Sequence, residues 1–200
     1  MSESRFTPER IRSLHTKSAE IVLSPKYISI TSDEIWGGVY FSRTGWCAHA
    51  PGDASPQWIG ENFRKALQTS EYFNKPEVPF LDREEIQLMK EASNRRRIAF
   101  LDEIVQTYGY KNRDEVVRRC DMVFTSWHYL IEDFVTLIAS KRVPGGHSAW
   151  GPMDKKKYAE TNLIVPLSVS DEELGLAIRD ALSRCEAPGR QKINSPPASI

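Results

Sequence analysis

Cys47 and His49 are the two residues whose types and spacing come closest to a chemical motif. Two positions apart on a strand, their side chains would share one face, so the pair could serve nucleophilic catalysis with a distant carboxylate. As metal ligands they are too few, because no second Cys/His pair at zinc-finger spacing accompanies them and His128 and His147 are isolated. A buried cysteine beside a loop histidine explains the pair without chemistry. We therefore predict no catalytic residue, no metal site and no cofactor.

Two acidic pairs stand where the chain is expected to turn between strands, each beside large aromatic side chains. An exposed acidic turn next to Trp or Tyr suits recognition of a basic partner protein, because such aromatic residues anchor interfaces. A solvated turn accounts for the same residues without a partner. The candidate partner-binding residues are Asp33, Glu34, Trp36, Trp127, Tyr129, Glu132 and Asp133.

The charge balance argues against a dedicated nucleic-acid or membrane-surface protein. Lys and Arg total 27, Asp and Glu also total 27, and the formal net charge is +0. The basic clusters at residues 95–97, 118–119 and 155–157 lack interleaved stacking aromatics, and the first two lie on predicted helices among carboxylates, where surface ion pairing is the default. No apolar run approaches the roughly 20 residues needed to span a bilayer, and the N-terminal residues lack the apolar segment of a secretory signal. Three widely spaced cysteines imply no disulfide framework and favour a reducing cytoplasm.

A repeated helix signal indicates how the chain is organised. Residues 55–70 align without a gap on residues 170–185, with Ser, Gly, Arg, Ala and Leu in identical positions. Each copy predicts an amphipathic helix that begins at a serine cap, and the second copy adds a glutamate three residues later as a capping box. The residues of this structural motif are Ser55, Gly60, Arg64, Ser170, Glu173, Gly175 and Arg179.

Gly60 and Gly175 occupy the same position inside the two predicted helices. A glycine in a helix interior costs about 1 kcal/mol relative to alanine. The same cost at equivalent positions indicates that another backbone passes close to each glycine. A ligand-cradling role is the weaker interpretation, because neither glycine belongs to a Gly-rich loop.

The remaining pattern predicts an α+β fold. We expect a pseudo-symmetric pair of units, each made of a β-hairpin, a strand and a helix, around an antiparallel sheet and joined by a long helix. The expected single domain covers residues 19–187, with halves at about 19–73 and 110–187. It follows an N-terminal extension at residues 1–18, which carries a short helix, and precedes a disordered tail at residues 188–200.

The elements expected within this frame follow from periodicity and capping signals. The long helix should span residues 81–108 and a short one residues 112–120. A β segment is expected at 21–31, interrupted near its start by Pro25, and further strands at 38–41 and 163–165. A hairpin from 122–129 and 134–138 should turn at Glu132-Asp133. Residues 74–80 and 144–152 should be irregular.

The closing segment resembles one branch of the bacterial contact-dependent growth-inhibition immunity proteins. A strand at residues 163–167 precedes a helix with the pattern Ser-x-x-Glu-Leu-Gly-x-x-Ile-x-x-Ala-Leu-Ser at residues 170–183, and residues 55–70 form a looser copy. The first copy departs from the pattern, with Pro-Gln-Trp where acidic residues are usual. The resemblance covers most of residues 20–186. It implies a non-enzymatic cytoplasmic protein that binds and neutralises a toxin domain, commonly a nuclease, delivered by a neighbouring cell.

Three functions therefore stand at this point. The first is an immunity protein whose acidic and aromatic turn residues bind the C-terminal toxin domain, with no nucleic-acid or membrane partner and no particular oligomeric state predicted. The second is a small hydrolase or transferase that uses Cys47 and His49. The third is a regulatory nucleic-acid-binding protein that uses the basic clusters.

Overall fold

The computed structural model describes residues 15–73 and 82–186. The expected short helix near the N-terminus, the irregular segment at residues 74–80 and the C-terminal tail lie outside these residues.

The described residues form an eight-stranded sheet and a separate two-stranded hairpin. The strand order is β10-β7-β6-β1-β2, and the long strand β2 pairs with β4 along its first half and with β3 along its second half. All pairs are antiparallel except the short parallel pair of β2 with β5. The bounds are β1 Ala19–Leu23, β2 Tyr27–Ile35, β3 Val39–Phe41, β4 Cys47–Pro51, β5 Glu71–Tyr72, β6 Asp121–Ser126, β7 Phe134–Ala139 and β10 Asn162–Pro166.

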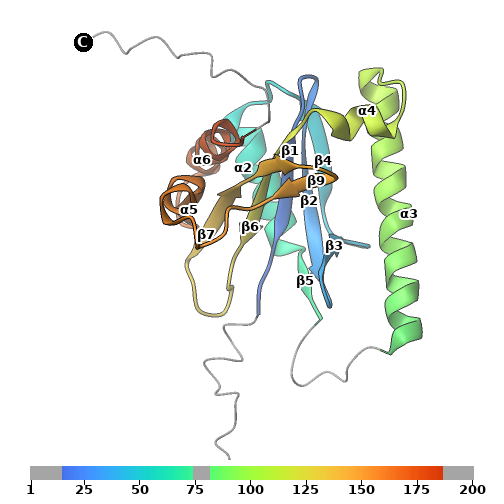
Figure 1. Ribbon diagram of the computed structural model, residues 1–200, viewed down its shortest axis with the longest axis horizontal. Helices are drawn as coiled ribbons and strands as arrows, with labels where there is room; N and C mark the ends of the chain where they lie inside the picture. The colour runs from blue at the N-terminus through green and yellow to red at the C-terminus, as the bar shows by residue number, and fades with distance from the viewer. Residues whose placement is uncertain (1–14, 74–81, 187–200) are drawn as a thin grey trace, which may run out of the picture.

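The two halves of the chain repeat one strand order about the junction of β1 and β6 (Figure 1). In the first half β1, β2 and β4 pair in succession before helix α2 (Pro56–Gln68), and in the second half β6, β7 and β10 do so before helix α6 (Asp171–Ser183). Ile21 on β1 lies opposite Val123 on β6, so both halves belong to one sheet. The α+β fold and its antiparallel sheet are confirmed.

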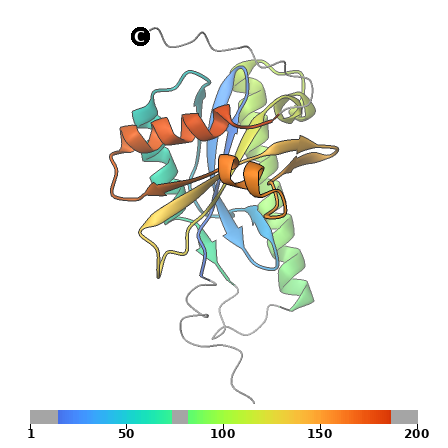
Figure 2. The same cartoon turned by 60° about the vertical axis from the view of Figure 1, so that its left-hand side comes forward.

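Helices α2 and α6 cover one face of the sheet, and Figure 2 shows α6 lying across α2. Ser55 and Ser170 cap the two helices as expected, and Glu173 completes a capping box with Ser170. The apolar faces of both helices are buried against the strands in one core, which includes Ile59, Phe63, Ile178 and Leu182.

The crossing point of the two helices is occupied by the two glycines. A Cβ atom at Gly60 would lie 1.9 Å from the carbonyl oxygen of Asp171, and one at Gly175 would lie 1.9 Å from the carbonyl oxygen of Pro56. Each helix therefore receives the first turn of the other helix at its glycine. The predicted close approach of a second backbone is confirmed at both positions.

The two repeated arginines reinforce the same crossing. Arg64 donates hydrogen bonds to the carbonyl oxygens of Leu167 and Val169 in the loop before α6 and pairs with Asp171. Arg179 donates to the carbonyl oxygen of Ala54 in the loop before α2, at 2.7 Å. Each arginine thus ties its own helix to the segment that leads into the other one.

The opposite face of the sheet carries helix α3 (Arg83–Tyr108) and the short helix α4 (Arg113–Arg118). The expected long helix is confirmed: Asp82 and Glu85 form its capping box, and Gly109 ends it with a φ of 63°. A second core includes Tyr27, Phe100 and Ile104. Figure 1 shows α3 running along the sheet on the side away from α2 and α6.

The segment after β7 differs from the expectation. Residues 144–152 were expected to be irregular, but β8 (Lys141–Val143) and β9 (Gly146–Ser148) form a hairpin around Gly145, whose φ is 87°. Helix α5 (Lys155–Thr161) follows, with Asp154 as its cap, and lies beside β7 and β10. The expected β segment at residues 21–31, with its interruption at Pro25, is the β1–β2 hairpin, which turns at that proline.

Replacing Gly175 with alanine should destabilise the protein by roughly 3 kcal/mol or more, because a backbone carbonyl fills the space of the new Cβ atom. The sign of the change in the free energy of unfolding is diagnostic, because without the close contact alanine would stabilise the helix by about 1 kcal/mol. Urea unfolding followed by circular dichroism measures the change. Gly151→Ala is the matched control, because a Cβ atom there meets nothing within 4 Å. Equal stability of Gly175→Ala and the parent would contradict the crossing.

Candidate functional site

Asp33, Glu34 and Trp36 do not stand at an exposed turn. They are 7 %, 0 % and 2 % exposed, because β2 continues through the acidic pair as far as Ile35. Asp33 accepts a hydrogen bond from the Ser18 hydroxyl at 2.7 Å, and the Arg43 guanidinium lies 2.9 Å from both oxygens of Glu34. The expectation of an exposed acidic turn at this position is therefore wrong.

The buried carboxyl of Asp33 is held in its protonated form. Burial, with a smaller contribution from the nearby Glu20 carboxyl, raises the pKa of Asp33 to about 8, and the hydrogen bond from Ser18 opposes the shift. Burial likewise raises the pKa of Glu20, and the Arg97 guanidinium opposes that shift. Two carboxyls on neighbouring strands thus share a poorly solvated region of the sheet.

The second group of predicted residues does come together, at the turn between β6 and β7. Trp127 donates its indole N–H to the carbonyl oxygen of Glu132 at 2.9 Å, and the Tyr129 ring packs edge-on against Trp127 at 6.0 Å. The Glu132 carboxylate accepts the backbone N–H of His128 at 3.1 Å. Asp133 is exposed. These contacts fix the shape of a seven-residue turn that projects from the sheet.

Sequence reasoning missed the two most exposed apolar residues of this turn. Leu130 is 47 % exposed and Ile131 is 52 % exposed. Adjacent aliphatic residues at the tip of a turn cannot both face the core, and that pattern could have revealed them. We call residues 127–133 the β6–β7 turn; it combines an aromatic base, an aliphatic tip and an exposed carboxylate.

Cys47 and His49 each have other polar partners in the structure. The His49 Nδ1 atom lies 3.0 Å from the Tyr108 hydroxyl, and its Nε2 atom lies 3.3 Å from the Glu103 carboxylate. Both ring nitrogens therefore have other partners. The Cys47 sulfur accepts a hydrogen bond from Arg96 at 3.4 Å, and burial raises the pKa of its thiol, which disfavours the nucleophilic thiolate.

Metal ligation and membrane crossing find no support in the described part of the chain. Residues 15–73 and 82–186 contain no group of three or more His, Cys, Asp or Glu side chains placed to hold a metal ion. Within the same residues, none of the helices has the length and apolar character that a membrane span requires.

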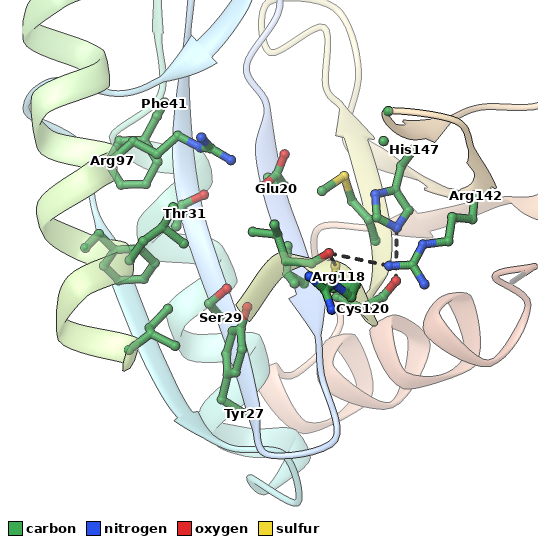
Figure 3. A pocket seen from close by; sticks show the side chains of 18 of the residues that line it. Glu20, Tyr27, Ser29, Thr31, Phe41, Arg97, Arg118, Cys120, Arg142 and His147 are labelled. Atoms are coloured by element: carbon green, nitrogen blue, oxygen red, sulfur yellow. Dashed lines mark hydrogen bonds between the residues drawn. The ribbon is translucent and has the colours of Figure 1, made fainter. Parts of the chain in front are cut away.

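A cleft of about 420 Å³ lies between α3 and the face of the sheet opposite α2 and α6 (Figure 3). Its floor is apolar and includes Phe100, Ile104 and Met122. The Glu20 side chain lies between Arg97 on one side and the β8–β9 hairpin on the other. A second cavity of about 380 Å³ shares Glu20 and Arg97 with the first and extends to Asp33.

The arginine cluster at residues 95–97 has three separate roles rather than one. Arg95 points outward and pairs with Glu91 at 4.0 Å. Arg96 donates to the carbonyl oxygens of Ser42 and Gly45, each at 2.6 Å, and so attaches α3 to the loop between β3 and β4. Arg97 lines the cleft. The expectation of plain surface ion pairing is met only by Arg95.

Comparisons with known proteins place this fold among a group of immunity proteins. A family model described as CDI immunity protein (CdiI) matches residues 17–185. A chain of the CdiA-CT/CdiI toxin and immunity complex from Yersinia pseudotuberculosis aligns with a TM-score of 0.68 and 18 % identity, covering 86 % of this chain and 98 % of that chain. A protein of unknown function from Neisseria meningitidis aligns with a TM-score of 0.65 and 21 % identity, covering 92 % and 100 %. No curated protein sequence matches the chain.

Replacing Asp33 with asparagine should remove a pH dependence of stability. The folded protein keeps the Asp33 proton up to about pH 8, whereas an unfolded aspartate loses its proton near pH 4. Between these values the unfolded chain binds fewer protons than the folded one, so the free energy of unfolding falls as pH rises. Asp33→Asn, which still accepts the Ser18 hydrogen bond, should therefore gain stability relative to the parent across this window.

Urea unfolding at about pH 5 and about pH 8 measures the difference between the two proteins. Asp53→Asn, at an exposed position, serves as the control and should show no such trend. A stability difference between Asp33→Asn and the parent that stays constant with pH would contradict a protonated Asp33.

Proposed function

The chain belongs to the CDI immunity protein family, and we propose that it protects a cell by binding and neutralising a cognate toxin domain. The observation that carries the proposal is the match of the family model over residues 17–185. The fold shared with a chain of a CdiA-CT/CdiI toxin and immunity complex supports it. We infer that the partner is a C-terminal toxin domain delivered by a neighbouring cell and that binding takes place in the cytoplasm.

Inhibition by binding is favoured over catalysis by the arrangement of the reactive side chains. The partners of His49 are Tyr108 and Glu103, so the imidazole has no nitrogen left to activate Cys47. A binding protein needs only a stable surface of complementary shape and charge, and the exposed residues of the β6–β7 turn are our candidate for that surface.

We infer that the toxin contacts the β6–β7 turn. Exposed aliphatic side chains beside a rigid aromatic pair are the composition of an interface centre, and carboxylates at its edge supply charge complementarity. Leu130 and Ile131 present the apolar area, Trp127 and Tyr129 pack against each other within the same turn, and Asp133 adds an exposed negative charge. Asp33, Glu34 and Trp36 are left out of this surface because they are buried.

We further infer that the toxin domain is a nuclease. A nuclease carries a basic surface for the phosphate backbone, and an exposed carboxylate at the turn complements such a surface. The partner-facing surface would then compete with nucleic acid for the toxin, and the chain itself would bind no nucleic acid.

A purified toxin domain tests the function directly. Degradation of RNA or DNA by the toxin should stop when the chain reaches a one-to-one ratio, and substoichiometric amounts should leave the remaining toxin active, because a binder acts by occupancy. Cys47→Ser should inhibit as well as the parent. Inhibition at far less than one equivalent, or its loss in Cys47→Ser, would point to catalysis. A toxin that binds the chain tightly but cleaves neither RNA nor DNA would contradict only the nuclease inference.

Variants of the β6–β7 turn test the surface. Ile131→Asp should weaken toxin binding by at least roughly tenfold, because it places a charge where apolar area is buried, and Asp133→Lys should do so by opposing a basic partner. Titration calorimetry measures the affinity. Met153→Asp is the matched control, since Met153 is 97 % exposed and lies outside the turn. Glu132 is kept intact because it holds the turn in shape. Affinities that match the parent in both turn variants would remove the turn from the interface.

A further inference from the structure

The cleft between α3 and the sheet has two electrostatically different ends. At one end Arg97 lies across from the Glu20 carboxyl, and its positive charge favours the ionised form of that carboxyl. At the other end Figure 3 shows Arg118, Arg142 and His147 gathered beside Cys120. The ion pairs among the described residues include neither Arg118 nor Arg142. That end of the cleft therefore carries two guanidinium groups without an ion-pair partner among residues 15–73 and 82–186, and Glu20 and Asp121 are the carboxyl groups that act with Arg142 on the Cys120 thiol.

Hydrogen bonds to backbone carbonyl groups hold the cationic end of the cleft in place. His147 donates its Nε2 hydrogen to the carbonyl oxygen of Cys120 at 3.0 Å, and this bond attaches the β8–β9 hairpin to the start of β6. The Arg142 guanidinium lies 3.5 Å from the carbonyl oxygen of Val117 at the end of α4. The hairpin turns through Gly145, which has no side chain to cover the mouth of the cleft.

The body of the cleft is apolar on the side of α3 and mixed on the side of the sheet, where Glu20, Ser29 and Thr31 also line it. Val22 and Met122 line it from the sheet, and Phe100, Leu101 and Ile104 line it from α3. A cavity of about 420 Å³ with an apolar floor and a few convergent polar groups has the size and character of a small-molecule site. Guanidinium groups match carboxylate, sulfonate and phosphate oxygens in geometry as well as charge.

We propose that this cleft binds a compact organic anion, with the acidic group of the ligand on Arg118 and Arg142 and its apolar body against α3. This site goes beyond the proposed toxin binding and does not depend on it, because the β6–β7 turn contributes no residue to the cleft. An anion bound by both guanidinium groups would offset their mutual repulsion, and the apolar side chains of α3 would select ligands that carry a hydrocarbon or aromatic portion.

The test uses 8-anilinonaphthalene-1-sulfonate, an aromatic anion whose fluorescence rises in apolar surroundings. The full chain in its folded state should show one saturable site. Octanoate should displace the dye, and octanol, its uncharged counterpart, should do so at least roughly tenfold less well. No saturable site, or equal displacement by octanoate and octanol, would overturn the proposal.

Arginine variants locate the site. Arg118→Gln and Arg142→Gln together should weaken dye binding by at least roughly tenfold, and Arg95→Gln, at an outward-facing position of α3, should leave it unchanged. Ile131→Asp should also leave it unchanged, which separates the cleft from the exposed aliphatic tip of the β6–β7 turn. Dye binding that survives loss of both arginines would overturn the assignment.

Toxin domain added to the dye complex separates this proposal from the proposed function. Toxin that binds without releasing the dye supports an independent small-molecule site. Toxin that releases the dye from the parent would make the cleft part of the protein interface, and it would overturn a separate anion site while leaving the immunity function intact.

Discussion

The contact on which the rest of this structure depends is the crossing of α2 and α6 at Gly60 and Gly175. Each glycine admits the first-turn carbonyl group of the other helix, and any side chain at either position would hold the two helices apart. Because the contact is reciprocal, it fixes both helices on the same face of the sheet. Arg64 and Arg179 repeat that reciprocity one turn later, each binding the loop that precedes the other helix. With that face closed, the other face remains available for α3 and the cleft.

The repeated helix was predictable because its causes are local and because they occur twice. A serine cap, an apolar face and a glycine at an unfavourable position are visible in the sequence alone. Because the glycine occurs at the same position in both copies, it indicated a structural cause. The strand order was less predictable from the sequence. The repeat indicated two related halves, but only the pairing of β1 with β6, at Ile21 and Val123, shows that they form one sheet.

The errors arose where distant residues changed the meaning of a local pattern. Asp33 and Glu34 read as a turn because consecutive carboxylates rarely occupy a buried strand. Ser18 and Arg43 supply the partners that make burial possible, and no short-range signal reveals them. Helix α5 and the β8–β9 hairpin were missed for a related reason. Both are short, and the hairpin is attached to the rest of the fold by His147 and Arg142 rather than by its own propensity.

The pseudo-symmetry also indicates where function is to be sought. Equivalent parts of the two halves share a structural role, whereas the insertions that break the symmetry have no counterpart in the other half. The β1–β2 connection is a tight turn at Pro25, but the equivalent β6–β7 connection is a seven-residue turn with an exposed aliphatic tip. The link between β7 and β10 likewise contains the β8–β9 hairpin, which closes one end of the cleft. A scaffold whose stability resides in the symmetric helix crossing can vary both insertions at little cost to folding. Such an arrangement suits the proposed recognition of one cognate toxin domain.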